Sequence, residues 1–484
     1  MTARVRRSIV LLATVLALCA VDSPPVPSRA PLTAAQVTSI DRFVTREMAR
    51  THVPGAAVGI YSRGTILLAK GYGFSNVELG VPVRPQTIFQ SGSVGKQFVS
   101  AAIMMLVEEG RVSLDDSITK YFPSAPASWK PILVKNLLSH TSGLAEYETP
   151  ERMSPNGPFY PRLDYTESQL LHKIEALPIE NAPGAKWNYR NTNYVLLGLL
   201  IRRVTGRFYA DYLAERIFKP LGMSSTRLIS EADIVPNRAA GYQWEGQLKN
   251  QDWVSPSINS TADGALYFNV LDLAKWDAAL YTTRLLTPSS LNEMWTVYKL
   301  NDGKPNPGSY GFAWRIHEQN GHRVLEHGGA WQGFTCDISR YPDDSLTVVV
   351  LTNLDSDHAR PDYMAQVIAG LSDAALMPQK LTAIADSEPR IAVSLARLLD
   401  DVSNGTGSQA STENRRLLKP LWPGASIALV QRGPSLDDGS LTVSEFRLTK
   451  GAQSMLAIYA LDAHGKTAIF LLQPNEEYRT RIAA

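Results

Sequence analysis

A serine and a lysine three residues apart, Ser93 and Lys96, are the pair in this sequence best suited to chemistry. On a helix, residues at this spacing lie one turn apart on the same face. A serine hydroxyl is a weak nucleophile until a base accepts its proton. The spacing is therefore the one that lets a lysine hold, and help to deprotonate, a serine nucleophile.

Two further segments supply groups that acyl transfer needs. Tyr189 and Asn191 place a phenol and an amide two residues apart, and His327 is followed by Gly328 and Gly329. The two glycines have no side chains, so backbone N–H groups can approach a developing oxyanion closely there and donate hydrogen bonds to it. Each segment alone is a weak signal. In this order, and together with the serine–lysine pair, they predict a secreted serine hydrolase.

Companion motifs surround these residues, at 88–92, 137–144, 183–184, 194–198, 220–223, 310–312 and 351–353. With them, the chain resembles the serine β-lactamase and penicillin-binding-protein superfamily. Within it, the motifs are similar to the branch of class C β-lactamases, D-alanyl-D-alanine carboxypeptidases, D-aminopeptidases and β-lactamase-fold esterases. The resemblance covers roughly residues 35 to 375, and the last hundred residues or so carry none of the motifs.

The resemblance implies a role for each residue of the site. Lys96 and Tyr189 share the task of the base, and Tyr189 also protonates the leaving group. The N–H groups of Ser93 and Ala330 are expected to form the oxyanion hole. Asn191 is expected to hydrogen-bond Lys96 or a substrate carbonyl, and capping the following helix is its alternative role.

His327 stands where class C β-lactamases carry the lysine of a Lys-Thr-Gly triplet, and Gly328 removes the hydroxyl of the threonine. Histidine is tolerated in the carboxypeptidase and D-aminopeptidase branches. It can donate toward a carboxylate or an ester, but it is not a fixed charge. We expect His327, Gly328 and Gly329 to line the substrate site, with weakened recognition of a β-lactam or D-Ala carboxylate. His140 is expected to organise a turn rather than to act in catalysis.

The predicted function is hydrolysis of an ester or amide through an acyl-serine intermediate, in the periplasm or outside the cell. Small esters rank first as substrates, D-amino-acid amides or peptides second, and β-lactams third. A β-lactamase or D-alanyl-D-alanine carboxypeptidase is the alternative, and a non-catalytic penicillin-binding-like sensor or binding module is a further one. No cofactor and no metal are predicted, because no Cys/His cluster has zinc spacing and no Gly-rich phosphate loop occurs.

Residues 1–20 predict a cleavable secretory signal peptide. They contain Arg4, Arg6 and Arg7 and then an apolar stretch that is too short to span a bilayer as a helix. An uncleaved membrane anchor is an alternative. A lipoprotein is another, because Cys19 ends the apolar stretch, although Leu18 is bulky where a small residue normally precedes a lipidated cysteine.

Charge and cysteine content limit the partners. The formal charge of +2 comes from the three arginines of the predicted signal peptide, and without them the balance is one negative charge. A nucleic-acid or anionic-membrane partner is therefore not indicated, and the expected partner is a small-molecule or peptide substrate. Cys336 alone remains after cleavage and cannot form an internal disulfide. The oligomeric state is left open.

The fold class predicted is α/β: a β-lactamase-like sandwich of a central antiparallel sheet with a helical region, plus a small C-terminal α+β domain. Apolar runs at 58–62 and 65–70 predict a hairpin around Arg63-Gly64, and runs at 334–340 and 346–351 predict a second. Helical patterns at 95–109, 192–205, 209–218 and 271–280 lie between them. The site is expected between sheet and helical region.

The domain boundaries follow from these patterns. Residues 1–20 are a signal peptide, 21–34 a linker, 35–376 the β-lactamase-like serine hydrolase domain, 377–389 a second linker and 390–484 a small α+β accessory domain. The accessory domain is predicted from an amphipathic helix at 391–399, a loop at 403–411 and strand-like runs at 426–430, 441–448, 455–461 and 467–472.

Overall fold

The computed structural model describes residues 29–356, 359–435, 441–474 and 476–478. The signal peptide predicted for residues 1–20 lies outside these ranges, as does most of the linker predicted for 21–34. Within the described ranges, no helix is both long enough and apolar enough to cross a membrane. In the same part of the chain, no three or more His, Cys, Asp or Glu side chains are placed so that they could hold a metal ion together.

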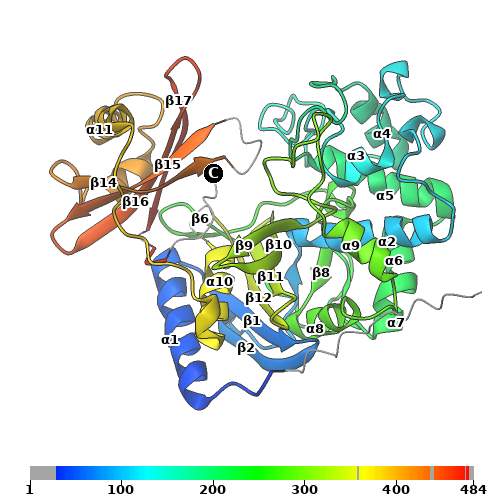
Figure 1. The fold of residues 1–484 in the computed structure, drawn as a ribbon, viewed down its shortest axis with the longest axis horizontal. Helices are drawn as coiled ribbons and strands as arrows, with labels where there is room; N and C mark the ends of the chain where they lie inside the picture. Colours follow the sequence, from blue (N-terminus) through cyan, green and yellow to red (C-terminus); the bar gives the residue numbers. More distant parts are fainter. Residues whose placement is uncertain (1–28, 357–358, 436–440, 475, 479–484) are drawn as a thin grey trace, which may run out of the picture.

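A seven-stranded antiparallel sheet forms the centre of the large domain (Figure 1). Its strands lie in the order β3-β2-β1-β12-β11-β10-β9. Their bounds are β1 Gly55–Ser62, β2 Thr65–Asn76, β3 Val81–Pro82, β9 Arg315–Gln319, β10 His322–Trp331, β11 Phe334–Tyr341 and β12 Leu346–Thr352. Both predicted hairpins, β1–β2 and β11–β12, are confirmed. The first and last long strands of the domain meet, because β1 pairs with β12.

Alternate residues of the inner strands point into two separate cores. In β1, Val58 and Ile60 pack with the helices α1 (Ala34–Thr51) and α10 (Pro361–Ser372) on one face of the sheet. The neighbouring Ala57 belongs to the core shared with the helical region on the other face. Since both faces are covered, β1, β11 and β12 are buried along their whole length. This explains why they read as continuous apolar runs.

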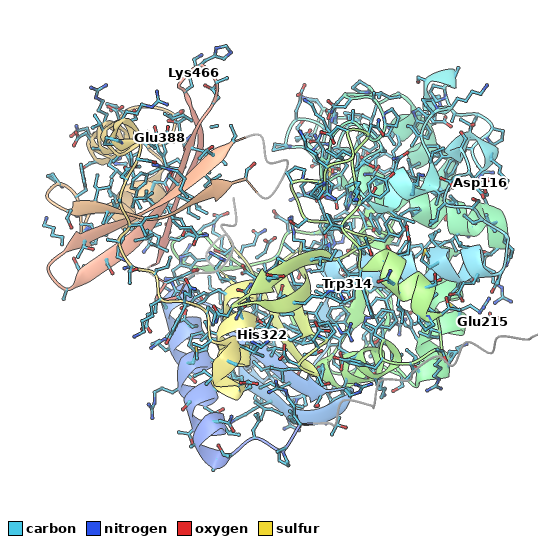
Figure 2. The ribbon with its side chains drawn as sticks, in the orientation of Figure 1. Asp116, Glu215, Trp314, His322, Glu388 and Lys466 are labelled. Carbon is cyan, nitrogen blue, oxygen red and sulfur yellow. The ribbon has the colours of Figure 1, made fainter. Side chains whose placement is uncertain are left out.

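The helical region lies against the face of the sheet opposite α1 and α10 (Figure 1). Its helices are α2 Lys96–Glu108, α3 Val134–Leu138, α4 Glu167–Glu175, α5 Asn191–Thr205, α6 Tyr209–Leu213, α7 Lys219–Leu221, α8 Val270–Ala279 and α9 Pro288–Met294. Trp314, labelled in Figure 2, belongs to the core on this face and is fully buried. The predicted helices at 95–109, 192–205 and 271–280 agree with α2, α5 and α8 within one residue at each end. The prediction at 209–218 is split into α6 and a π-helical turn.

Two small sheets connect this region to the central sheet. One consists of β4 (Phe89–Gln90), β8 (Leu266–Phe268) and β5 (Arg227–Leu228). The other consists of β13 (Leu354–Asp355), β6 (Tyr242–Trp244) and β7 (Leu248–Asn250). Because β4 runs directly into the turn that carries Ser93, its pairing with β8 brings residues 263–265 beside that serine.

The C-terminal part has its own sheet and core, and lies apart from the helical region (Figure 1). Strands β14 (Ser426–Pro434), β15 (Thr442–Lys450), β16 (Gln453–Leu461) and β17 (Thr467–Pro474) form an antiparallel meander. Helices α11 (Pro389–Asn404) and α12 (Thr412–Leu418) accompany it. Leu395 and Leu399 of α11 pack against Phe446 and Tyr459 of the sheet. This is the small α+β unit that the sequence predicts.

An ion pair joins the C-terminal part to the large domain. Arg360, next to the start of α10, lies 2.9 Å from the Glu476 carboxylate and donates a hydrogen bond to Gln473. Arg360 and Glu476 are both buried, with side chains 7% and 3% exposed. The Tyr363 hydroxyl also accepts a hydrogen bond from the backbone N–H of Glu477. The two parts are therefore held together by buried polar contacts as well as by the connecting chain.

Candidate active site

Ser93 is the one residue between 87 and 106 that is not buried. It lies in a single 3₁₀ turn, Gly92–Gly95, and α2 begins immediately afterwards at Lys96. Thus the sequence expectation that serine and lysine share one helical turn holds, but the turn is 3₁₀ rather than α. Gly92, two residues after the end of β4, has φ +45°, a conformation that favours glycine, and there the chain turns into the helix.

The turn around Ser93 is interlocked with the outer end of β10. A Cβ atom on Gly92 would lie 2.4 Å from the backbone nitrogen of Ala330, and one on Gly329 would lie 2.8 Å from the nitrogen of Ser93. Only glycine fits at both positions. The two N–H groups assigned to the oxyanion hole, those of Ser93 and Ala330, are therefore on backbone segments in direct contact.

Lys96 is fully buried, and its ammonium group is surrounded by three acceptors. Its Nζ lies 2.7 Å from the Ser93 hydroxyl oxygen and 2.8 Å from the amide oxygen of Asn191, and it also bonds the backbone carbonyl of Asp263. An ammonium group donates three hydrogen bonds. A neutral amine keeps two of them and can accept the third, so loss of one proton leaves Lys96 ready to accept the proton of Ser93.

Burial lowers the pKa of Lys96 to about 8, because the charged form loses its hydration. Asp263, Glu148 and Glu146 oppose this effect when they are ionised, since each then stabilises the ammonium. Burial, together with the neighbouring Asp263, raises the pKa of Glu148 to about 8, and burial also raises the pKa of Glu146. The balance leaves a lysine that is partly neutral near pH 7, which is the property required of a general base.

Asn191 connects the lysine to one of these acids. Its amide oxygen accepts from Lys96, and its amide nitrogen donates to Glu148 at 2.8 Å. It is the first residue of α5, whose N-cap residue, Arg190, makes no side-chain capping bond. Of the two roles expected for Asn191, the structure contains the bond to Lys96.

Tyr189 lies over the lysine with a buried hydroxyl. The Lys96 nitrogen is 5.1 Å from the centre of the phenol ring. Burial raises the pKa of Tyr189, while the nearby Ser93 hydroxyl and the Arg315 cation lower it by less. In the described part of the chain the Tyr189 oxygen has no hydrogen-bond partner within bonding geometry, so Ser93 is a neighbour rather than a bonded partner. The resting tyrosine is a neutral phenol with a proton to give.

His327 has both ring nitrogens engaged within the protein. Nδ1 lies 2.6 Å from the carbonyl oxygen of Gly328, which can only accept, so Nδ1 carries the proton. Nε2 then accepts from the Tyr310 hydroxyl at 2.7 Å. Burial lowers the pKa of His327 to about 3, and the Lys96 cation adds to this effect. The ring is neutral and its single N–H does not face a substrate.

His140 supports the tyrosine. Its backbone has φ +58°, and its Nδ1 accepts from the backbone N–H of Arg190, so it organises a turn as expected. Its ring centre is also 4.2 Å from that of Tyr189. Burial lowers its pKa well below the usual histidine range. His140 is therefore a neutral ring that packs against the phenol of Tyr189.

A small cavity that opens to solvent lies beside the serine, with about 30 Å³ of space that water-sized molecules can occupy. Its wall consists of Ser93, Tyr147, Glu148, Asn191, Ile258, Thr261, Asp263, Gly264, Ala265, Ala330 and Trp331. A second, larger hollow of about 370 Å³ shares Glu148, Ala330 and Trp331 with it. The structure thus brings the predicted Ser93, Asn191 and Ala330 to one cavity, with Lys96 behind them. Gly328 and Gly329 lie on β10 next to Ala330 and are not part of the cavity wall.

Three acidic residues near the lysine were not found from the sequence. Glu146 accepts the backbone N–H of Asn191, Glu148 lines the cavity, and Asp263 accepts the Tyr147 hydroxyl at 2.8 Å. Glu146 and Glu148 follow the motif at 137–144, and their alternate spacing is the one local signal they leave. Asp263 leaves no local signal in the sequence, because the pairing of β4 with β8 alone brings it close to the site.

Comparison with known proteins agrees with this geometry. A family model described as Beta-lactamase matches residues 40–372, which is more than half of the chain. The chain belongs to the β-lactamase family. Members of this family are generally serine hydrolases.

Individual relatives are distant but cover much of this β-lactamase-family chain. It is 26% identical to penicillin-binding protein 4* of Bacillus subtilis over 392 residues, 73% of this chain and 82% of that protein. A D-stereospecific amidohydrolase from Streptomyces sp. is similar in structure, with a TM-score of 0.55 and 28% identity, over 66% of this chain and 94% of that chain.

One solved structure resembles nearly the whole chain. It is the octameric penicillin-binding protein homologue from Pyrococcus abyssi, with a TM-score of 0.61 and 24% identity. The match covers 91% of this chain and 96% of that chain. At this level of identity the likeness concerns the fold, and it extends beyond the residues that the family model matches.

Proposed function

We propose that this protein hydrolyses an ester or amide bond through an acyl intermediate on Ser93. One observation carries the proposal. The partly exposed Ser93 hydroxyl lies 2.7 Å from the nitrogen of a fully buried lysine whose pKa is lowered to about 8. A lysine kept for structure alone does not need to face a serine at the edge of a cavity.

Acylation begins with neutral Lys96. It accepts the proton of Ser93 while the serine oxygen attacks the carbonyl carbon of the substrate. The carbonyl oxygen becomes negatively charged and is stabilised by the N–H groups of Ser93 and Ala330. Lys96 is then an ammonium, and its bonds to Asn191 and Asp263 hold it in place.

Tyr189 supplies the proton for the leaving group. Its hydroxyl is neutral and has no internal partner among the described residues, so it is free to donate to a departing alcohol or amine. The phenolate that remains is stabilised by the neighbouring Lys96 cation, which can return a proton to it. Water then enters, loses a proton to the same pair of groups and releases the acyl group from Ser93.

The substrates proposed first are small esters and D-amino-acid amides or peptides. The neutral, internally bonded His327 and the missing side chain of Gly328 favour substrates that lack a carboxylate at this position. The similarity to the Streptomyces D-stereospecific amidohydrolase supports amides as one of the two substrate classes. Penicillin binding is the second candidate function, because the Bacillus subtilis relative is a penicillin-binding protein. Export is proposed from residues 1–20 alone.

A turnover panel tests the proposal. Purified protein is given p-nitrophenyl esters, D-alanyl amides and nitrocefin, with the Ser93→Ala variant as the matched control. The proposal expects turnover of esters or amides that exceeds nitrocefin hydrolysis and disappears in the variant. No turnover, combined with no labelling of Ser93 by a fluorophosphonate, would reject a hydrolase and favour the non-catalytic module.

A further inference from the structure

A second pocket lies in the helical region and shares a loop with the serine site. Helices α4 and α5, the segment that begins α6 and the loop 257–263 form it, and water-sized molecules can occupy about 120 Å³ of it. We call it the helical pocket. Residues 258 and 263 of the loop line the cavity beside Ser93, residues 257, 260 and 262 line the helical pocket, and Thr261 lines both. The loop is therefore a wall between the two spaces.

The surface of the helical pocket is mainly apolar. The side chains that supply this surface are Leu170, Val195, Leu199, Phe208 and the rings of Tyr165 and Tyr209. Of the described residues that form the wall, none is basic, and the one carboxylate, that of Glu167, is paired with Arg202 at 2.9 Å. A charged ligand would therefore lose its hydration without gaining a counter-charge.

The hydroxyl groups in the wall are already used within the protein. They belong to Tyr165, Tyr209, Ser257, Ser260 and Thr261, and each makes a hydrogen bond of 2.8–3.1 Å. The bond from Tyr209 to the Thr261 carbonyl also joins the start of α6 to the loop. A ligand that needed a hydrogen bond here would have to displace an existing one, so the net gain would be small. The pocket thus favours a ligand that needs none.

The size of the helical pocket is close to that of a known benzene site. An engineered apolar cavity of about 150 Å³ in another protein stays dry and binds benzene or xenon. The helical pocket, at about 120 Å³, is of the same order and opens to solvent, so that a ligand can enter. Its aromatic side chains, Phe208, Tyr165 and Tyr209, offer ring surfaces against which another ring can pack.

Both elements that enclose the pocket also hold Lys96. Helix α5 begins at Asn191, whose amide oxygen accepts a hydrogen bond from Lys96. The loop ends at Asp263, whose backbone carbonyl accepts another. The helix and the loop are in direct contact, because a Cβ atom on Gly198 would lie 2.4 Å from the Cβ of Ala262. A ligand in the helical pocket therefore touches the two supports of the general base.

We propose that the helical pocket binds a small uncharged aromatic molecule, which acts as an effector of the serine site through α5 and the loop 257–263. This molecule is distinct from the substrate, because Ser93, Lys96 and Tyr189 do not belong to the wall of the pocket. By filling the space between the helix and the loop, it restricts their movement and keeps two acceptors of Lys96 in place. The binding site is independent of the proposed function, and the effector role rests on it.

Benzene is the probe for binding. Urea unfolding of the full chain is measured with increasing benzene, and separately with pyrimidine, a ring of similar size whose two nitrogens would lose their hydrogen bonds to water in the pocket. A molecule that binds only the folded protein raises the urea midpoint as its concentration increases. Benzene is expected to raise the midpoint, and pyrimidine is not. A midpoint that benzene leaves unchanged, or that pyrimidine raises equally, would refute the binding site.

Two tryptophan variants locate the site. Leu170→Trp places an indole in the pocket from α4, and it should abolish the rise of the midpoint with benzene. His172→Trp is the matched control, because it adds the same side chain to the same helix at a position that is 87% exposed and outside the pocket wall. It should keep the rise. If Leu170→Trp does not fold, the comparison of benzene with pyrimidine in the parent protein remains decisive.

The rate at which a fluorophosphonate labels Ser93 tests the effector role. Benzene should raise this rate by about fivefold or more in the parent and in His172→Trp, the lower end of the usual coupling between two sites. The rate in Leu170→Trp should not respond. An unchanged or lower rate in a parent protein whose midpoint benzene raises would refute the effector role.

Two other results would have different consequences. A response to benzene that persists in Leu170→Trp would mean that benzene acts elsewhere, which overturns the assignment of the pocket. If Ser93 does not label even without benzene, the proposed function and the effector role fail together, whereas the urea measurement still decides whether the helical pocket binds benzene.

Discussion

Raising the pH should switch on the nucleophilicity of Ser93 with a midpoint set by Lys96. Burial lowers the pKa of this lysine to about 8, from about 10.4 in water. At pH 7 about a tenth of the molecules then carry a neutral lysine, more than about a hundredfold above the fraction for an unperturbed side chain. Only the neutral form accepts the serine proton. The rate should therefore rise about tenfold from pH 6 to 7 and level off above about pH 8.

The assay is the second-order rate of phosphonylation by a fluorophosphonate between about pH 6 and about pH 10, with the modified peptide identified by mass spectrometry. Lys96→Arg is the matched control, because it keeps a positive charge but cannot release its proton in this range. It should label slowly at every pH. Asp263→Asn removes a carboxylate that stabilises the ammonium, so it should move the midpoint to lower pH.

Three results would refute this reasoning. A midpoint near 10 would mean that burial does not weaken the lysine. A midpoint near 6.5 would point to a histidine as the base. Equal rates for Lys96→Arg and the parent across the range would remove the lysine from the chemistry altogether.

Tyr189→Phe should lower kcat for amides by about a hundredfold or more, because the departing amine must receive a proton. The kcat for p-nitrophenyl esters should fall much less, because p-nitrophenolate leaves without a proton. Equal falls in kcat for amides and esters would exclude the role of Tyr189 as the acid. Asp277 and Arg340 form an ion pair 2.9 Å apart in which both side chains are 0% exposed. Asp277→Ala should lower the free energy of unfolding in urea by about 3–5 kcal/mol, because it leaves the buried Arg340 cation without this acidic partner. A change below about 1 kcal/mol would contradict this prediction. Glu476→Ala should lower the free energy of unfolding in urea by about 1–3 kcal/mol, because it removes the partner that Arg360 has in the C-terminal part and leaves Asp362 as its remaining acidic partner. Unchanged urea unfolding would mean that this ion pair does not join the two parts.

The central sheet and the position of the nucleophile could be predicted because their signals are local. The turn at Arg63-Gly64 has positive φ at both residues, β1 before it is buried along its whole length, and β2 after it begins with the apolar residues 66–69. Ser93 and Lys96 carry their spacing within four residues. Helices α1 and α10 were not predicted, although they cover one whole face of the sheet. They carry no catalytic motif, and the one signal they leave in the sequence is the helical spacing of their buried apolar residues.

The electrostatics of the site could not be predicted for a physical reason. Glu148 and Asp263 are 115 residues apart in the chain, so their proximity depends on the pairing of β4 with β8 and on the packing of the loop after α3. The state of His327 was equally hidden, because a sequence shows a histidine but not the Tyr310 hydroxyl that occupies its free nitrogen. Charge and tautomer are properties of the folded surroundings.

The central claim is that Ser93 becomes acylated during turnover. Its most direct test is to mix the protein briefly with a p-nitrophenyl ester, stop the reaction with acid and measure the mass of the peptide that contains Ser93. The account predicts that this peptide gains the mass of the acyl group and that the Ser93→Ala variant shows neither the gain nor the turnover. Turnover with the acyl group on another residue, or undiminished turnover in Ser93→Ala, would contradict it.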